Sequence, residues 1–408
     1  MLPKQASAGK NARDLRGANR VLLLSLIREA GSISRAELAR RTRLTRSTVS
    51  QVVADLIERN LVREEGPVKG GPGRRPVSLR YQAESQLVLG LDIGGTNIVA
   101  ALGDLDGNIL RHETWPLPAF SAAAPLLDWL ADRSQTFVSS YAAGRHPCVA
   151  GVATPGVVDV QAGVVLDASP NLPEWNGLAL SAELERRMGW PVLVENDVNL
   201  ALLGEMRAGA AVGKENVALL VVSTGIGGAL ALGGRLYRGR RGAAGELGYW
   251  LMGREHLASD WGTHGCLESL VSGSAIARRA VAECLDLGHP TAKELFASAR
   301  GGHAQASRVV AEVADWLGMA VTNLLSLLDL DCVLLGGGVA QSADLLLDRI
   351  QATVARHSLG HPLAKSVIQS LVQTTALREL SGVRGALQIA ADRAVERSLQ
   401  DPEEALLR

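Results

Sequence analysis

Three glycine-rich turns, each directly after an apolar run, constrain the fold of this 408-residue chain more than any other feature. Apolar runs of this length predict buried strands. Glycine has no Cβ, so the backbone N–H groups of such turns can approach a phosphate. The repetition predicts an α/β domain with phosphate loops at its strand ends. The runs and the turns that follow them are 87–93 with Gly94-Gly95-Thr96, 217–222 with Ser223-Thr224-Gly225, and 332–335 with Gly336-Gly337-Gly338.

A polar cluster follows a further apolar strand, between the first two turns. The strand at 192–194 runs into Glu195-Asn196-Asp197-Val198-Asn199. A carboxylate at a strand end can accept the proton of an attacking hydroxyl in phosphoryl transfer, and Asp197 is the candidate base. Asn196 or Asp197 suits the cap of a helix over 200–208 equally well. Spacing alone leaves the two interpretations open.

Charge is distributed unevenly along the chain, although the net charge is zero. Residues 1–80 hold 17 Lys or Arg against 7 Asp or Glu, a net charge of +10, and the remainder carries −10. A basic segment attached to an acidic body is typical of a nucleic-acid-binding domain joined to another domain. A solvated basic tail is the alternative that charge alone leaves open.

Helical periodicity in the basic segment predicts a helix-turn-helix. Helices fit 19–30, 34–41 and 46–59, with the residues before 19 polar and frayed. Ser34 and Thr45 are the expected caps of the second and third helices, and Ser34 with Glu37 forms a capping box. Polar side chains at the start of the third helix can reach base edges in a major groove. These candidates are Thr45, Arg46, Ser47, Thr48, Ser50 and Gln51.

A loop rich in glycine and proline follows at 66–76, between strands expected at 61–62 and 77–81. The cations Lys69, Arg74 and Arg75 of this loop would lie near the DNA phosphates or in the minor groove if the loop is a wing. A flexible linker is the alternative, and the flanking strands favour the wing. We therefore expect residues 1–82 to form a winged helix-turn-helix that binds double-stranded DNA.

Four motifs of the remaining chain, taken in order, resemble those of the ROK family, which comprises bacterial repressors and sugar kinases. With a winged helix in front, the chain resembles the repressor branch, typified by xylose and N-acetylglucosamine repressors. The resemblance covers about 19–393. It implies that 86–408 form a two-lobed, actin-like (ribonuclease H-like) sugar-kinase domain, with lobes at about 86–198 plus the C-terminal helix and about 199–380. The motifs are Asp92-Ile93-Gly94-Gly95-Thr96, Glu195-Asn196-Asp197-Val198-Asn199, Gly245-Glu246-Leu247-Gly248 and Gly265-Cys266-Leu267-Glu268.

The resemblance also implies roles for individual residues. Asp197 matches the catalytic base of the family, and ATP with Mg²⁺ would be the cofactors, with Asp92 able to hold a hydrated magnesium ion. The implied sugar ligands are Asn171, Asn196, Asp197, Glu246 and Glu268, with Tyr249 beside them. The implied nucleotide ligands are Asp92, Gly94, Gly95, Thr96, Thr224, Gly225, Gly336, Gly337 and Gly338.

The chain departs from the family pattern at the loop that binds zinc in the family. Tyr249 stands where the family has His, and Ser259 and Trp261 stand where it has Cys. Cys266 alone cannot form a closed tetrahedral site, so we expect no structural zinc and no ligands for any metal besides the magnesium ion that accompanies ATP. The alternative ligand set is His256, His264 and Cys266.

Together these features predict a sugar-responsive DNA-binding regulator, a repressor of carbohydrate-utilisation genes that acts as a homodimer on a two-fold operator. The four dispersed cysteines and the lack of a long apolar run predict a cytoplasmic protein with no membrane partner. The alternative is an ATP-dependent sugar kinase that carries a DNA-binding module, which the intact phosphate turns and Asp197 favour. A third hypothesis, an actin-like scaffold that binds no ligand, is disfavoured because it leaves Glu246 and Glu268 without a role.

The wing assignment predicts distinct effects for two kinds of substitution. Replacing both Arg74 and Arg75 by Ala should weaken binding to any DNA and reduce the salt slope by about 2, because two phosphate contacts are lost. Gln51→Ala should instead change the preferred sequence. Fluorescence-anisotropy titrations at several salt concentrations measure both effects. An unchanged affinity and slope in the double variant would refute the wing.

Overall fold

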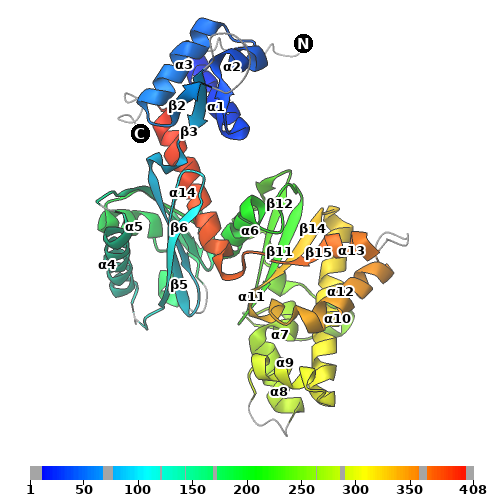
Figure 1. Ribbon diagram of the computed structural model, residues 1–408. Helices are drawn as coiled ribbons and strands as arrows, with labels where there is room; N and C mark the ends of the chain where they lie inside the picture. The colour runs from blue at the N-terminus through cyan, green and yellow to red at the C-terminus, as the bar shows by residue number, and fades with distance from the viewer. Residues whose placement is uncertain are drawn as a thin grey trace, which may run out of the picture.

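The computed structural model describes residues 12–67, 77–119, 122–142, 144–168, 172–262, 264–284, 290–357 and 365–400. Figure 1 shows a small head above two lobes, and one long helix that runs from between the lobes up to the head. That helix is α14 (Ser381–Leu399). The head contains the amino-terminal helices, and the lobes contain the three glycine-rich turns.

Three helices and a three-stranded sheet of order β1-β3-β2 form the head. Ser34 Oγ accepts the N–H of Glu37 at 3.2 Å, and Thr45 Oγ1 accepts that of Thr48 at 3.1 Å, so both predicted caps are present. The Glu37 carboxylate pairs with Arg40 and does not bond the backbone of Ser34, so only half of the predicted capping box is formed. The elements are α1 (Ala12–Ala30), β1 (Ile33–Ser34), α2 (Arg35–Thr42), α3 (Arg46–Glu58), β2 (Val62–Pro67) and β3 (Val77–Tyr81).

The first helix differs from the prediction, because α1 begins at Ala12 and not at residue 19. Residues 12–18 were expected to be frayed on account of their polarity. Alanine, leucine and arginine are strong helix formers, and here propensity decides the conformation of a polar segment.

The first lobe is built on a five-stranded sheet of order β10-β7-β4-β5-β6, in which β4, β7 and β10 are parallel. Helices α4 (Ala123–Tyr141) and α5 (Leu180–Met188) pack on one face of the sheet, and α14 packs on the other. A short hairpin lies beside the sheet. The strands are β4 (Leu87–Ile93), β5 (Asn97–Gly103), β6 (Ile109–Pro116), β7 (Pro147–Thr154) and β10 (Val192–Asn196), with β8 (Val157–Asp159) and β9 (Val164–Asp167) in the hairpin.

The second lobe repeats this plan with a five-stranded sheet of order β13-β12-β11-β14-β15. Helix α6 (Asp197–Ala208) packs on one face. A larger helical layer covers the other face, and its core helix α10 (Ala304–Leu328) is long and apolar enough to cross a membrane but is mostly buried. The strands are β11 (Val217–Val222), β12 (Ile226–Leu232), β13 (Arg235–Leu236), β14 (Cys332–Gly336) and β15 (Val372–Thr374). The other helices are α7 (Cys266–Val271), α8 (Gly273–Glu283), α9 (Ala292–Arg300), α11 (Gly337–Ala340), α12 (Ala343–His357) and α13 (Lys365–Leu371).

Helices α6 and α14 cross between the lobes at a very short distance. A Cβ on Gly204 would lie 2.2 Å from Ser381 O, and one on Gly385 would lie 1.9 Å from Leu200 O. Only glycine permits backbones to approach this closely. The crossing therefore fixes where the two lobes meet.

One hydrophobic core joins the head to α14. Leu23, Ile27 and Leu79 of the head belong to the same buried cluster as Val383 and Leu387 of α14. The head is therefore packed on the body and is not merely tethered to it.

The shared core predicts that a truncation on α14 destabilises head and first lobe together. Leu387 is fully buried, so Leu387→Ala should lower the free energy of unfolding by about 2–5 kcal/mol. Leu327→Ala is the matched control, because Leu327 is 72% exposed and should change stability by less than about 0.5 kcal/mol. Calorimetry measures both. A head that melts separately at an unchanged temperature would contradict the shared core.

Candidate functional site

The strand-to-helix turn at Asn196 and Asp197 forms the centre of the site. Asn196 Oδ1 accepts the N–H of Asn199 at 3.0 Å, so Asn196 is the cap of α6. Asn196 Nδ2 donates to Asp197 Oδ1 at 3.0 Å. Burial raises the pKa of Asp197 to about 6, a value suited to proton transfer near neutral pH. The segment was open to two interpretations, a helix cap and a catalytic base. Asn196 is the cap, which leaves Asp197 available as the base.

Carboxylates from the second lobe gather around Asp197. Glu246 directly precedes a short helical turn at Leu247–Tyr249, and Glu268 lies on α7. Burial raises the pKa of Glu246, and the charges of Asp197, Asp167 and Glu268 raise it further, so these carboxylates face one site. Carboxylates are strong acceptors for the many hydroxyl groups of a sugar.

Two residues of this site stand apart from the prediction. Asp167, at the end of β9, contributes to the acidic cluster, but no motif marked it because a single Asp after an apolar strand has no distinctive spacing. Asn171, the remaining expected sugar ligand, lies outside the described residues.

Tyr249 lies at the rim of the acidic cluster. Its side chain is 56% exposed. Partial burial and the charges of Glu246, Asp167 and Glu268 raise the pKa of the phenol. A phenol here borders the sugar site without filling it.

Glu268 connects the acidic cluster to the second glycine turn. Its Oε2 accepts the N–H of Ile226 at 2.7 Å, and a Cβ on Gly225 would lie 2.8 Å from the same oxygen. Glycine at this position therefore makes room for the carboxylate. The candidate sugar site and the candidate phosphate turn share Glu268.

A cavity of about 530 Å³ extends from this turn to the third glycine turn. Ser274 Oγ donates to Thr224 O at 2.9 Å, which places the start of α8 against the second turn. Three further lining residues on α9 were not predicted, because they belong to an ordinary helix without a glycine motif. They are Lys293, Phe296 and Arg300.

The third turn differs from the expected plain turn, because it continues as the short helix α11. Gly336 is the residue before the helix and Gly338 lines the cavity. Gly337 has φ +84°, and a Cβ there would lie 2.4 Å from Val222 O. Position 337 combines a left-handed backbone conformation with a close approach to β11, and glycine tolerates both.

Asp92, in β4 just before the first glycine turn, lies close enough to Asp197 for the charge of that carboxylate to act on it. Gly94 N–H donates to Asn97 O at 2.9 Å and closes the turn that also contains Gly95 and Thr96. Burial and the charge of Asp197 raise the pKa of Asp92 to about 8. A divalent cation would offset this repulsion, and Mg²⁺ is commonly held by one or two carboxylates together with phosphates and water. Asp92 and Asp197 therefore fit the magnesium ion that the resemblance implies.

Aromatic packing holds the loop in which the family binds zinc. The ring of His256 lies edge-on to Trp261 and Trp316, with centroids 5.3 and 5.5 Å apart. Trp261 Nε1 donates to His256 O at 3.2 Å, and Trp250 packs against the core of the second lobe. Within the described ranges, no group of three or more His, Cys, Asp or Glu is arranged to hold a metal. The lack of structural zinc stays a prediction.

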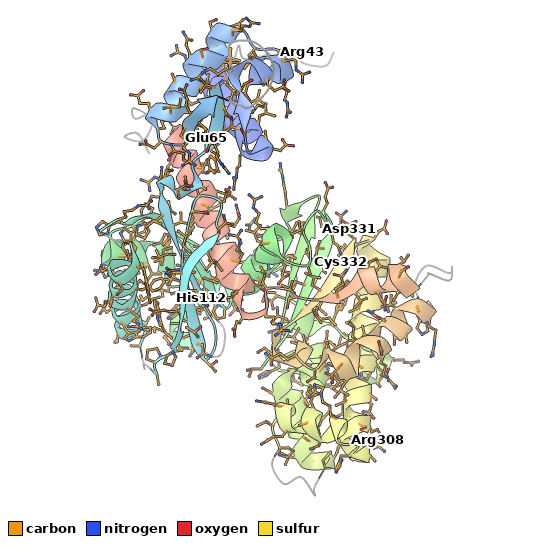
Figure 2. The ribbon with its side chains drawn as sticks, in the orientation of Figure 1. Arg43, Glu65, His112, Arg308, Asp331 and Cys332 are labelled. Atoms are coloured by element: carbon orange, nitrogen blue, oxygen red, sulfur yellow. The ribbon has the colours of Figure 1, made fainter. Side chains whose placement is uncertain are left out.

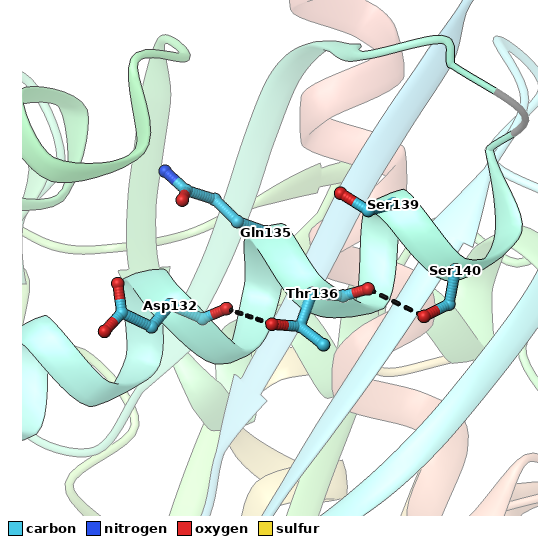
Figure 3. Close-up of a pocket in the computed structure, with 5 residues that line it drawn as sticks. All are labelled: Asp132, Gln135, Thr136, Ser139 and Ser140. Carbon is cyan, nitrogen blue, oxygen red and sulfur yellow. Dashed lines mark hydrogen bonds between the residues drawn. The ribbon is translucent and has the colours of Figure 1, made fainter.

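A second hollow lies on the outer face of α4 and does not form a site (Figure 3). All five lining residues come from that one helix, and the hydroxyls of Thr136 and Ser140 donate to its own carbonyls at 2.9 Å. Gln135 Nε2 donates to the carbonyl of Arg187 in α5 at 3.3 Å, a contact that joins the two helices and offers no group to a ligand. The lining residues are Asp132, Gln135, Thr136, Ser139 and Ser140.

Helix α3 of the head presents the expected polar face. Arg46, Ser47 and Gln51 are exposed, whereas Thr45 and Thr48 form the cap of α3. Arg43, in the turn before α3, is also exposed and lies at the outer end of the head (Figure 2). The predicted wing cations Lys69, Arg74 and Arg75 lie outside the described residues.

The raised pKa of Asp92 predicts that binding of a magnesium nucleotide depends on pH. In the ligand-free protein Asp92 is protonated below about pH 8, and a neutral carboxyl is a poor ligand for Mg²⁺. The affinity for Mg²⁺ with AMPPNP should therefore increase from about pH 7 to about pH 9, as isothermal titration calorimetry can measure. Asp92→Asn should remove this increase. A wild-type profile as flat as that of the variant would contradict the assignment.

Comparison with known proteins agrees with this geometry. The model of the ROK family matches residues 88–393, and the model of the MarR family matches residues 14–71. The xylose repressor of Bacillus subtilis is 27% identical over 338 residues, covering 83% of this chain and 86% of that protein. The glucokinase of Streptomyces coelicolor is 32% identical over 324 residues, covering 75% of this chain and 98% of that protein.

Two solved structures share the fold. A ROK family transcriptional regulator, a homologue of the E. coli MLC protein, gives a TM-score of 0.77 at 25% identity and covers 94% of this chain and 98% of its own. A ROK family glucokinase from Streptomyces griseus in complex with glucose and AMPPNP gives 0.62 at 32% identity, with 75% and 99% covered. This chain belongs to the ROK family, in its repressor branch, and joins a winged helix of the MarR type to the ROK domain.

Proposed function

We propose that a sugar bound between the lobes changes the affinity of the head for its operator, and that the protein is thereby a sugar-responsive repressor of carbohydrate-utilisation genes. Helix α14 is the observation that carries the proposal, because it begins between the two lobes and ends against the head (Figure 1). The acidic cluster of Asp92, Asp167, Asp197, Glu246 and Glu268, to which both lobes contribute, is here called the cleft. The similarity to a xylose repressor and to an MLC-like regulator supports the same class of function.

The start of α14 lies against groups of the cleft. Gly382 is so close to Asp92 that a Cβ would lie 2.2 Å from Asp92 Oδ2. Ser381 Oγ donates to Glu205 Oε1 at 2.7 Å, and Glu205 is fully buried on α6, the helix that Asp197 begins. A ligand that moves Asp92 or α6 would therefore displace the start of α14.

Two arginines of the head hold the other end of α14. Arg20 Nη1 donates to Leu399 O at 2.8 Å, and Arg59 Nη1 donates to Ser398 O at 2.7 Å. Cations at this end of a helix also interact favourably with its dipole. Asp55 accepts from the Nε of both arginines, at 2.5 and 2.8 Å. The 19 residues of α14 span about 28 Å, so a rigid element connects the cleft with the head.

A polar cluster along α14 adds a second link to the head. Arg28 of α1 pairs with Asp106 in the turn between β5 and β6, at 2.6 Å. Arg384 of α14 donates to Asp106 O at 3.4 Å. The orientation of α1 is therefore tied to the first turn of α14 as well as to its end.

The coupling free energy required between sugar binding and operator binding is of ordinary size. A ligand shifts an equilibrium only by its differential affinity for the two states. Allosteric coupling free energies of about 1–3 kcal/mol correspond to changes of about 5–150-fold in affinity. Rearranging a few contacts of α14 is sufficient for an effect of this magnitude.

ATP-dependent phosphorylation of a sugar is a second candidate function, favoured by the cavity at the second and third turns and by Asp197. Asp197 would accept the proton of the sugar hydroxyl, and Mg²⁺ would neutralise phosphate charge when bound beside Asp92. Tyr249 argues against efficient turnover, because the family has a sugar-contacting His at this position. Positioning supplies much of the catalysis in phosphoryl transfer, so we place regulation first.

The proposed partners are a double-stranded DNA operator and a sugar. Helix-turn-helix proteins commonly bind two-fold sites as dimers, so we propose a homodimer. Cys148, Cys266, Cys284 and Cys332 are all free thiols, which supports a reducing cytoplasmic location.

Operator binding in the presence of sugars tests the proposed function. Selection from random duplexes supplies the operator, and anisotropy measures its Kd with D-xylose, D-glucose or N-acetyl-D-glucosamine, without ATP. At least one sugar should shift the Kd by about 5–150-fold. Glu246→Gln should remove the shift and leave the sugar-free Kd unchanged. Arg59→Ala should retain sugar binding and reduce the shift, because it releases the end of α14.

A coupled kinase assay on the same sugars tests the alternative function, phosphorylation of a sugar. Turnover of several per second that Asp197→Asn abolishes, together with an operator Kd that no sugar changes, would contradict the regulator and establish the kinase. Asp197→Asn is suited to this test because an amide cannot accept the hydroxyl proton yet preserves the shape of the side chain.

A further inference from the structure

An ion pair that no motif predicted crosses from one lobe to the other beside the sugar residues. Glu195 Oε2, in β10 of the first lobe, accepts from Nε of Arg238, in the loop after β13 of the second lobe, at 2.5 Å. We propose that this pair is the positioning contact of the sugar site: it fixes Asn196 and Asp197 relative to Glu246. The proposal deepens the sugar-responsive function and rests on it.

On the first lobe, Glu195 organises the turn that leads into α6. Its side chain is only 4% exposed. Oε1 accepts from the backbone N–H of Asn196 and from Nδ2 of Asn199, both at 3.0 Å. Asn196 in turn donates to Asp197 Oδ1. The carboxylate that Arg238 holds therefore orders the segment that presents the proposed base.

On the second lobe, Arg238 belongs to the loop that leads to Glu246. The carbonyl of Arg238 accepts the N–H of Ala244 at 3.1 Å, so the conformation of the arginine is tied to the end of the loop. Gly242 of the same loop approaches the first lobe, where a Cβ would lie 2.7 Å from Val158 O. The loop thus meets the first lobe at two points, one a close approach of backbones and one an ion pair.

The burial of Glu195 makes this pair more consequential than an ion pair between two surface residues, although the Arg238 side chain is 37% exposed. Removing Arg238 leaves the buried carboxylate without its cation, whereas pairs in which both partners are exposed contribute little. The pair forms only when the two lobes stand at a particular separation. It therefore favours the arrangement in which ligands from both lobes face the same sugar, and a site assembled in advance binds with less ordering cost.

Sugar affinities of single and double variants of the full-length protein test the proposal. The probes are D-glucose and D-xylose, measured by calorimetry. Arg238→Ala and Glu195→Gln should each weaken binding by about tenfold, and the double variant should be no weaker than either, because both remove the same interaction. Arg238→Lys should recover part of the affinity, since Lys restores the charge but not the planar donor geometry. Arg240→Ala, an exposed arginine in the same loop, is the matched control and should be neutral.

Hydrogen exchange of the sugar-free protein provides a readout that does not depend on the identity of the sugar. In Arg238→Ala, amides of 195–199 and 238–246 should exchange faster, while amides of the head and the sugar-free operator Kd should not change. A general loss of folding would alter all of them. If the wild type binds neither sugar, the proposed function fails for those sugars, and exchange at 195–199 still decides the role of the pair.

Three results would overturn the proposal. They are wild-type sugar affinity in Arg238→Ala, losses in the single variants that simply add in the double variant, and exchange at 195–199 that Arg238→Ala leaves unchanged. Each would mean that the ion pair is an incidental contact and that the turn before α6 is ordered without it.

Discussion

The close crossing of α6 and α14 is the constraint on which the rest of the structure depends. Gly204 and Gly385 let the two backbones touch, and Glu205 fastens them by accepting from Ser381 Oγ and from the N–H groups of Ala376 and Leu377. A buried carboxylate with several donors is a rigid junction. Each helix begins at the cleft, so the same crossing that joins the lobes also determines where Asp92 and Asp197 stand.

The chemistry of the cleft follows from this arrangement. Acidic side chains from both lobes are buried together. Burial raises the pKa of Asp92 to about 8, with the charge of Asp197 adding to the shift, and burial raises the pKa of Asp197 to about 6. Such a cluster is unfavourable while empty and is relieved by hydroxyl donors or a cation. Because Asp167 belongs to the first lobe and Glu246 to the second, a ligand that relieves the repulsion also determines how the lobes lie. Sugar binding and the relative arrangement of the lobes are therefore coupled.

Local chemistry was predictable from the sequence, whereas contacts between distant segments were not. The strands, the glycine turns and the caps at Ser34 and Thr45 depend on neighbouring residues, so periodicity and composition were sufficient to find them. The Glu195–Arg238 pair, the role of Glu205 and the hold of Arg59 on α14 join segments far apart in the chain. An isolated charged residue in a sequence has no pattern that reveals its partner. Asp167, Lys293 and Arg300 escaped prediction for the same reason.

The central claim is that α14 transmits sugar binding to the head. Hydrogen exchange along the full-length protein, with and without a sugar that binds, tests it most directly because each amide reports on its own segment. The account predicts that the sugar changes exchange in the cleft, along α14 and in the head around Arg20 and Arg59. Changes confined to the two lobes, with α14 and the head unaffected while operator affinity still responds to the sugar, would contradict it.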